Sequence, residues 1–157
     1  MSSEDLMKGL REGDRVPGFT LRDQDGKLVD MSEHIGKGKL VIYFYPADFT
    51  SICTMEARAF REMHEGFMRE GAKVFGISSD SVESHKRFAT EHELPFTLLS
   101  DPEGKVREMF GAVGIGGTPA RVTYVIDEKG VVRMVYSSAL QGKKHSEEAM
   151  KAVKGLS

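Results

Sequence analysis

The chain has 157 residues, a length that fits one domain with room for a buried core, and we expect a single domain over residues 1–157. Hydrophobic residues make up 39% and charged residues 29% of the sequence, and the formal net charge is −2. This balance is typical of a globular protein and gives no reason to expect nucleic acid or a membrane surface as a partner. No apolar stretch is long enough to span a bilayer.

The beginning of the sequence and its cysteine content predict a cellular location. The N-terminal segment MSSEDLMKGLREGD is polar and lacks the apolar core of a signal peptide. Cys53 is the single cysteine, so the chain cannot form an internal disulfide. Both observations predict a reducing compartment, the cytoplasm.

Runs of apolar, β-branched and aromatic residues predict the strands. The first element is a hairpin over Phe19–Met31, with Asp25–Gly26 at its centre as the turn. Four longer strands follow at Lys39–Tyr45, Ala72–Ser78, Arg121–Asp127 and Val131–Ser137. The last two are joined by Glu128–Gly130, so they form a second hairpin.

Helices are predicted between these strands. Apolar residues recur at helical spacing from Ser51 to Glu70, which predicts an amphipathic helix there. Three further helices are predicted to begin at Asp80, at Asp101–Pro102 and at Ser146. The first of these has Glu83 in a capping-box position and runs to about Glu93, because Pro95 blocks its continuation.

The order of these elements predicts the fold class. Strand–helix–strand units favour parallel crossovers, whereas the late hairpin adds antiparallel strands. We therefore expect an α/β protein with a mixed central β-sheet, helices on both faces and an N-terminal β-hairpin. The thioredoxin-like fold is the candidate arrangement of this kind.

Cys53 follows a buried strand by one short loop and lies in the first turn of the predicted helix. Unpaired backbone N–H groups and the positive end of the helix dipole favour the thiolate, which is the nucleophilic form of cysteine. The alternative is that Cys53 is a small buried hydrophobic residue, as free cysteines often are.

The neighbours of Cys53 favour the reactive interpretation. Thr50 lies three residues before Cys53, where its hydroxyl can face the sulfur, and Pro46 can shield the site from water. Glu56 lies three residues after Cys53 and could hold an arginine in place. Phe49 either covers the pocket or belongs to ordinary packing.

The segment YFYPADFTSICTMEARAF resembles the active-site segment of peroxiredoxins, in its Pro-x-x-x-Thr-x-x-Cys form. The Cys-Thr-x-Glu-Ala continuation is most similar to the peroxiredoxin Q, or bacterioferritin-comigratory, branch. The likeness extends over nearly the whole chain, through VPGFTLRDQDGKLVDMSEH, VFGISSDSVESHKRFATEHELPFTLLSDPEGKV and RVTYVIDEKGVVR.

The resemblance implies a thiol peroxidase that reduces hydrogen peroxide and organic hydroperoxides and needs no cofactor. It matches Cys53 to the peroxidatic cysteine, Thr50 to the hydroxyl residue, Pro46 to the shielding proline and Arg121 to the catalytic arginine. Without the motif, Arg121 would be interpreted as part of a surface ion pair. Attack of the Cys53 thiolate on a peroxide oxygen would leave a sulfenic acid.

This sequence departs from the branch in one respect. Many members carry a second cysteine five residues after the first, and here that position is Arg58. The sulfenic acid must then be resolved by a thiol from elsewhere, such as a small thiol, a thioredoxin-like protein or Cys53 of a second subunit. Either a monomer or a homodimer is compatible with the sequence.

Other functions are compatible with parts of this pattern. A thiol-based redox sensor shares the first chemical step, and a catalytically idle thioredoxin-fold interaction module would not need Pro46, Thr50, Cys53 and Arg121 together. The five histidines are scattered, so no metal site is expected, although His85 and His92 can share one face of a helix.

Overall fold

The computed structural model describes residues 9–156, so part of the N-terminal segment discussed above lies outside the described residues. Its centre is one seven-stranded sheet in the order β2-β1-β5-β4-β3-β6-β7. The strands are β1 (Thr20–Asp23), β2 (Leu28–Asp30), β3 (Lys39–Phe44), β4 (Ala72–Ser78), β5 (Thr97–Ser100), β6 (Val122–Ile126) and β7 (Val132–Ser137). The predicted strands and both hairpins are therefore present with closely similar bounds.

The sheet is mixed, as predicted. Strands β3, β4 and β5 pair in parallel through the crossover helices, whereas β6 pairs antiparallel with β3 and β7 antiparallel with β6. The β1–β2 hairpin joins the sheet through an antiparallel pairing of β1 with β5. That the whole chain forms one domain stays a prediction.

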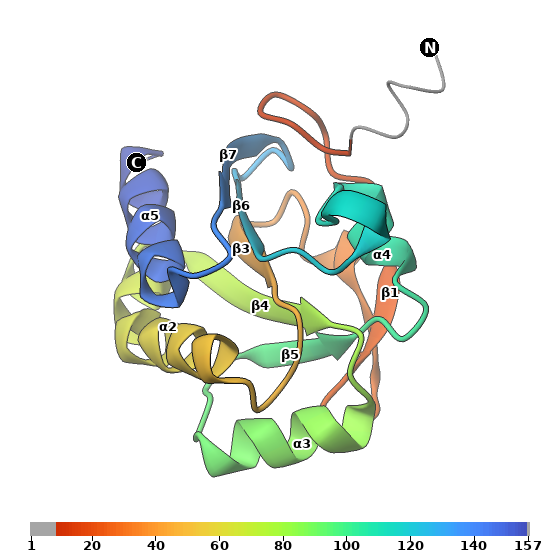
Figure 1. Cartoon of the computed structure of the whole chain (residues 1–157). Coiled ribbons are helices and arrows are strands. Elements are labelled where there is room, and N and C mark those ends of the chain that lie inside the picture. Colours follow the sequence, from red (N-terminus) through yellow and green to blue (C-terminus); the bar gives the residue numbers. More distant parts are fainter. Residues whose placement is uncertain (1–8, 157) are drawn as a thin grey trace.

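Helices cover both faces of the sheet (Figure 1). The longer helices α2 (Ser51–Arg69), α3 (Val82–Glu91) and α5 (Gly142–Gly155) pack on one face, and the short α4 (Lys105–Phe110) packs on the other. The short helices η1 (Met31–Glu33) and η2 (Ile115–Gly117) lie in connections. Among the described residues, no helix combines the length and the apolarity that crossing a bilayer requires.

Strand β3 is buried on both sides because its side chains alternate between two cores. Val41 and Tyr43 belong to the cluster beneath α2, α3 and α5. Ile42 and Phe44 belong to the cluster beneath α4. An uninterrupted apolar strand at the centre of the sheet therefore fixes the position where the chain leaves it toward Cys53.

Three predicted helix starts were wrong, and the structure gives a reason for each. Helix α3 is capped by Ser81, whose hydroxyl accepts from the Ser84 N–H, because the Asp80 carboxylate accepts from the Asp48 N–H instead. Helix α4 begins at Lys105, after a turn whose Asp101 carboxylate accepts from two helix N–H groups.

Helix α5 begins at Gly142, a turn before Ser146, which lies inside it. Gly142 packs against the first turn of α2, where an added Cβ would lie 2.7 Å from the Ile52 carbonyl oxygen. A glycine is required at this close approach, so the start of α5 is set by contact with α2 rather than by a capping side chain.

The antiparallel pairing of β3 with β6 positions the site. Phe44 at the end of β3 pairs with Val122 at the start of β6. Arg121 precedes Val122, and the loop to Cys53 follows Phe44, so the sheet register brings together residues that are far apart in the sequence.

Candidate active site

Cys53 lies in the first turn of α2, with only 1% of its surface exposed. The residue before the helix, Thr50, has extended backbone angles, and its side chain caps none of the first N–H groups. The first turn of α2 therefore keeps backbone donors near the sulfur, as expected at a helix N-terminus. The hydrogen-bond partner of Cys53 is Arg121, whose Nη2 lies 3.3 Å from Sγ.

The Arg121 guanidinium is held by three acceptors. Its Nη2 donates to Cys53 Sγ, its Nη1 donates to Glu56 Oε1 over 2.6 Å, and its Nε donates to the Ala139 carbonyl oxygen over 3.0 Å. Because the guanidinium is planar, these three contacts fix both its position and its orientation. The structure thus brings Cys53, Glu56 and Arg121 into one buried cluster.

Glu56 is fully buried beside Arg121. Burial raises the pKa of the Glu56 carboxyl to about 8, and the adjacent Arg121 guanidinium opposes this rise. Glu56 Oε1 binds Arg121, whereas Oε2 has no hydrogen-bond partner. The carboxylate therefore depends on Arg121 for its stabilisation, and it in turn keeps the guanidinium next to the sulfur.

His145 on α5 lies behind this cluster and was not singled out from the sequence. Its Nδ1 is 2.7 Å from Thr123 Oγ1 and 3.6 Å from Glu56 Oε2, and its Nε2 is 2.9 Å from the Ser138 carbonyl oxygen. Since a carbonyl can only accept, Nε2 carries the hydrogen and Nδ1 accepts from the threonine hydroxyl. Burial lowers the pKa of His145 to about 4.

A neutral, buried His145 predicts weaker stability in acid. Between the ordinary pKa of 6.5 and the folded value of about 4, the unfolded chain binds a proton that the folded chain does not. His145 should therefore lower the free energy of unfolding by about 2 kcal/mol when the pH falls from about 7 to about 5. Urea titrations at the two pH values measure this loss.

The matched variants are His145→Gln and His92→Gln, which replaces a half-buried histidine at the C-cap of α3. The loss between the two pH values should become smaller in His145→Gln and stay the same in His92→Gln. Equal losses in the wild type and in His145→Gln would show that His145 takes up its proton in the folded protein.

The loop before α2 carries the other predicted site residues. Pro46 is half-buried, and Thr50 is exposed with its hydroxyl donating to the Ala47 carbonyl oxygen over 2.9 Å. Phe49 has a φ of 66°, is 45% exposed, and sets its ring edge against Phe88 on α3 at 5.1 Å. Phe49 thus packs on α3, and the Thr50 hydroxyl bonds within the loop.

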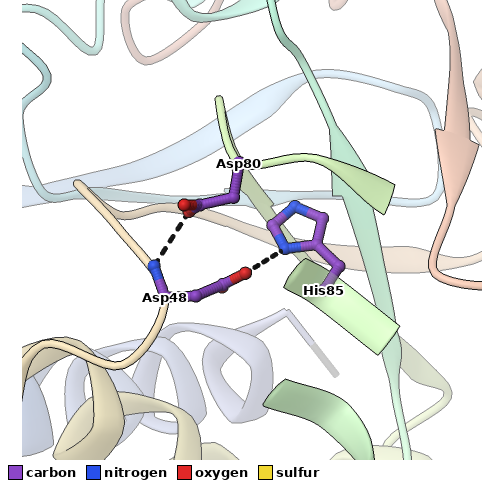
Figure 2. A group of neighbouring side chains, drawn as sticks. All are labelled: Asp48, Asp80 and His85. Carbon is purple, nitrogen blue, oxygen red and sulfur yellow. Dashed lines mark hydrogen bonds and ion pairs between the residues drawn. The ribbon is translucent and has the colours of Figure 1, made fainter. Parts of the chain in front are cut away.

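Asp48, in the same loop, is the other residue that the sequence analysis missed. Its carboxylate lies 2.7 Å from Nδ1 of the buried His85, and its N–H donates to Asp80 Oδ2 (Figure 2). One possible ligand atom from each of these three residues lies within 4.8 Å of the others. Hydrogen bonds between the side chains explain this grouping, because each of these atoms already has a protein partner.

Arg58, at the position where the family resemblance implied a second cysteine, is exposed on α2, whereas Cys53 on the same helix is buried. Any thiol that resolves an oxidised Cys53 must therefore come from outside the chain.

A buried cysteine at a helix start, bonded to an arginine just before β6 of a mixed sheet, is the arrangement expected of a thiol-based redox protein of thioredoxin-like fold. The chain belongs to the AhpC/TSA family, whose model matches residues 13–135. Within that family it falls in the peroxiredoxin Q branch, as the sequence predicted.

Relatives and solved structures agree with this assignment. The chain is 49% identical over 149 residues to a chloroplastic peroxiredoxin Q of Sedum lineare, covering 94% of this chain and 80% of that protein. A peroxidoxin, BcpB, of Mycobacterium tuberculosis has a TM-score of 0.88 at 35% identity, covering 94% of this chain and 99% of the other. A peroxiredoxin Q of Xanthomonas campestris has a TM-score of 0.79 at 30% identity, covering 87% and 90%.

The predicted cytoplasmic location was wrong. The curated relatives, including those of Sedum lineare and Arabidopsis thaliana, are named as chloroplastic proteins. The physical reason is that one cysteine and a moderate charge describe a folded domain in a reducing environment, whereas location is read by receptors from separate address segments.

Proposed function

We propose that the chain is a one-cysteine peroxiredoxin, a thiol-dependent peroxidase that reduces hydrogen peroxide and organic hydroperoxides. The observation that carries this is the 3.3 Å contact between Arg121 Nη2 and Cys53 Sγ at the start of α2. A thiolate bonded to a fixed cation and close to free backbone donors is the nucleophile that peroxide reduction requires. Membership of the peroxiredoxin Q branch supports the same conclusion.

The first step is attack of the Cys53 thiolate on one peroxide oxygen. A sulfur–oxygen bond forms as the oxygen–oxygen bond breaks, and the electron pair of that bond moves to the leaving oxygen. The leaving oxygen takes up a proton and departs as water or as an alcohol, while Cys53 becomes a sulfenic acid.

Arg121 and the loop stabilise this step. Negative charge moves from the sulfur toward the leaving oxygen, so donors fixed beside both atoms stabilise the transition state. Arg121 supplies the charged donor, Glu56 holds it in place, and the first turn of α2 supplies backbone N–H groups. Pro46 shields the thiolate from water, and Thr50 fixes the loop through its bond to the Ala47 carbonyl oxygen.

The second step needs a thiol from another molecule, because the chain has one cysteine. An external thiol displaces the sulfenic oxygen as water and forms a mixed disulfide with Cys53, and a second thiol then releases the reduced enzyme. We expect the reductant to be a small thiol or a thioredoxin-like protein. We expect the enzyme to be a monomer or a homodimer of this single-domain chain.

Peroxide consumption with dithiothreitol as reductant tests the function. The purified protein should consume many equivalents of peroxide, and one equivalent without reductant should add a single oxygen atom to the peptide that contains Cys53. Oxygen found only on the nine methionines would overturn the proposal. Oxidation of Cys53 without turnover would favour the redox sensor instead.

A further inference from the structure

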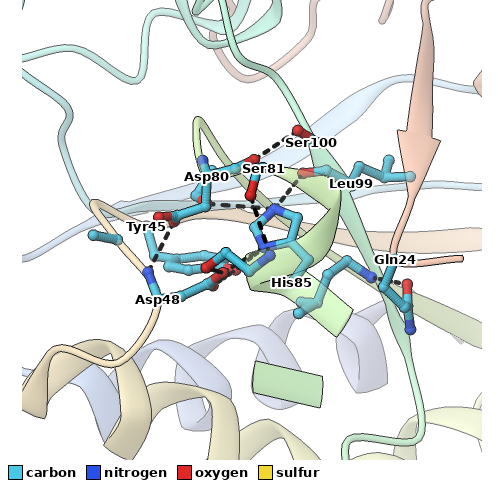
Figure 3. Close-up of polar contacts among 12 residues, drawn as sticks. Gln24, Tyr45, Asp48, Asp80, Ser81, His85, Leu99 and Ser100 are labelled. Atoms are coloured by element: carbon cyan, nitrogen blue, oxygen red, sulfur yellow. Dashed lines mark hydrogen bonds and ion pairs between the residues drawn. The ribbon is translucent and has the colours of Figure 1, made fainter. Parts of the chain in front are cut away.

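The loop that carries Pro46 and Thr50 is held by a buried network, whose role rests on the proposed peroxidase function and deepens it. This loop leaves the end of β3 and contains Asp48, whose carboxyl side chain is buried. Figure 3 shows Asp48 meeting side chains from the ends of β3 and β4 and from α3. A buried carboxylate persists only where several donors compensate for its lost hydration.

Every polar group of the Asp48 side chain is bonded. Its Oδ1 accepts from the Tyr45 hydroxyl over 2.6 Å. Its Oδ2 accepts from the Ser84 hydroxyl over 2.8 Å and lies 2.7 Å from His85 Nδ1. The backbone N–H of Asp48 donates to Asp80 Oδ2 over 2.8 Å. The middle of the loop is therefore tied to β3, to the residues after β4 and to α3.

His85 is the imidazole partner of Asp48 in this network. It is fully buried, with Nδ1 against the Asp48 carboxylate and Nε2 3.1 Å from the Leu99 carbonyl oxygen on β5. A carbonyl oxygen can only accept, so Nε2 is the ring nitrogen that donates to Leu99. The ring therefore bridges the Asp48 carboxyl group and strand β5 inside the core.

The next residue of the loop shows why such a pair is needed. Phe49 adopts a φ of 66°, a left-handed conformation that costs a bulky residue about 1 kcal/mol or more. Such a conformation persists only where the surrounding contacts determine it. Here Asp48 is fixed on one side, and the Phe49 ring rests on Phe88, one helical turn after His85.

We propose that His85 is a positioning residue for the peroxidase reaction: through Asp48 it holds the Pro46–Thr50 loop against α3 in the strained conformation that sets the start of α2 and hence the donors around Cys53. His85 does not touch the sulfur in this arrangement and acts through Asp48. Loss of the pair lets the loop relax, which moves the groups that stabilise the transition state while leaving the thiol in place.

The test compares two reactions of Cys53 in His85→Gln and in the wild type. Oxidation by hydrogen peroxide needs the positioned donors, whereas alkylation by iodoacetamide needs only an accessible thiolate. A displacement of about 1 Å can cost about 10²-fold in rate, so we expect the peroxide rate to fall between about 10-fold and 100-fold. The alkylation rate should not fall, because a relaxed loop shields the buried thiol less.

The control is His34→Gln, because His34 lies beside Lys73 and Phe75, away from the loop, and both rates should be unchanged. Asp48→Asn weakens the same His85–Asp48 contact from the loop side, so it tests the proposal even where His85→Gln is poorly folded. The double variant should match the single variants, since both remove one interaction.

Two results would overturn the inference. Peroxide rates equal to the wild type in both His85→Gln and Asp48→Asn would show that the pair does not position the loop. Equal losses of the peroxide and alkylation rates would show that the pair acts on the thiolate or on the fold as a whole. If the wild-type protein does not react with peroxide, both the proposed peroxidase function and this inference are overturned. This outcome is distinguishable from the others, because the wild-type rate is measured before any variant is compared with it.

Discussion

Replacing Cys53 with serine should abolish peroxide consumption. An alcohol is not ionised at neutral pH, so the serine hydroxyl would not provide the nucleophile that breaks the oxygen–oxygen bond. The fold should survive, because serine has the shape of cysteine and Arg121 can donate to its oxygen as it does to Sγ over 3.3 Å. Peroxide loss with dithiothreitol and the thermal unfolding midpoint measure the two effects.

The matched control is Ser51→Ala in the same turn of α2, which should keep its turnover. Turnover by Cys53→Ser at more than trace level would show that another group reduces peroxide. The chain would then be better described as a thioredoxin-fold interaction module with a structural thiol.

Replacing Arg121 with glutamine should slow the oxidation of Cys53 by about 10²-fold to 10³-fold, the loss expected when one donor to a developing charge is removed. Arg121 is the only side chain bonded to Cys53 among the described residues. The rate with excess hydrogen peroxide, compared with that of Arg133→Gln on the exposed side of β7, measures the effect. Arg121→Lys keeps the positive charge but lacks the planar guanidinium group with its several donors, so its oxidation rate should lie between those of Arg121→Gln and the wild type.

Loss of Arg121 also leaves Glu56 buried without its cation, which can cost about 3–5 kcal/mol of stability. Burial raises the pKa of Glu56 and Arg121 opposes that rise, so without Arg121 the carboxyl can take up a proton, which reduces this cost. The double variant Arg121→Gln, Glu56→Gln should therefore regain stability without regaining rate. Recovery of both would mean that Arg121 acts on the fold and not on the reaction.

Much of the fold could be predicted from local patterns. The apolar run at Lys39–Tyr45 predicts a strand, and the helical spacing of apolar residues after Ser51 predicts a helix. Both patterns depend only on residues that are close together in the sequence. Helix starts were harder, because a side chain such as Asp80 can cap a helix or bind elsewhere, and only the tertiary contacts decide between these. The start of α5 at Gly142 likewise depends on a contact with α2.

The candidate site divides in the same way. The Pro-x-x-x-Thr-x-x-Cys motif places Pro46, Thr50 and Cys53 within one loop and one helical turn, so their sequence predicts their proximity. Arg121 could be assigned only through resemblance to a family, because the register of β3 against β6 is what brings it to the sulfur. His145 and His85 gave no sequence signal beyond being histidines on amphipathic helices.

The sequence by itself determined the class of protein, because that class depends on residue types and short spacings. The proposals that Cys53 is the reactive thiol and that the reductant is external also come from the sequence, through its motif and its single cysteine. The tertiary structure alone decided that Glu56 and Arg121 form a buried pair and that Asp48 and His85 tie the loop to α3. Both pairs have the same physical basis. A buried polar or charged side chain needs a partner, and the fold determines which partner is close enough.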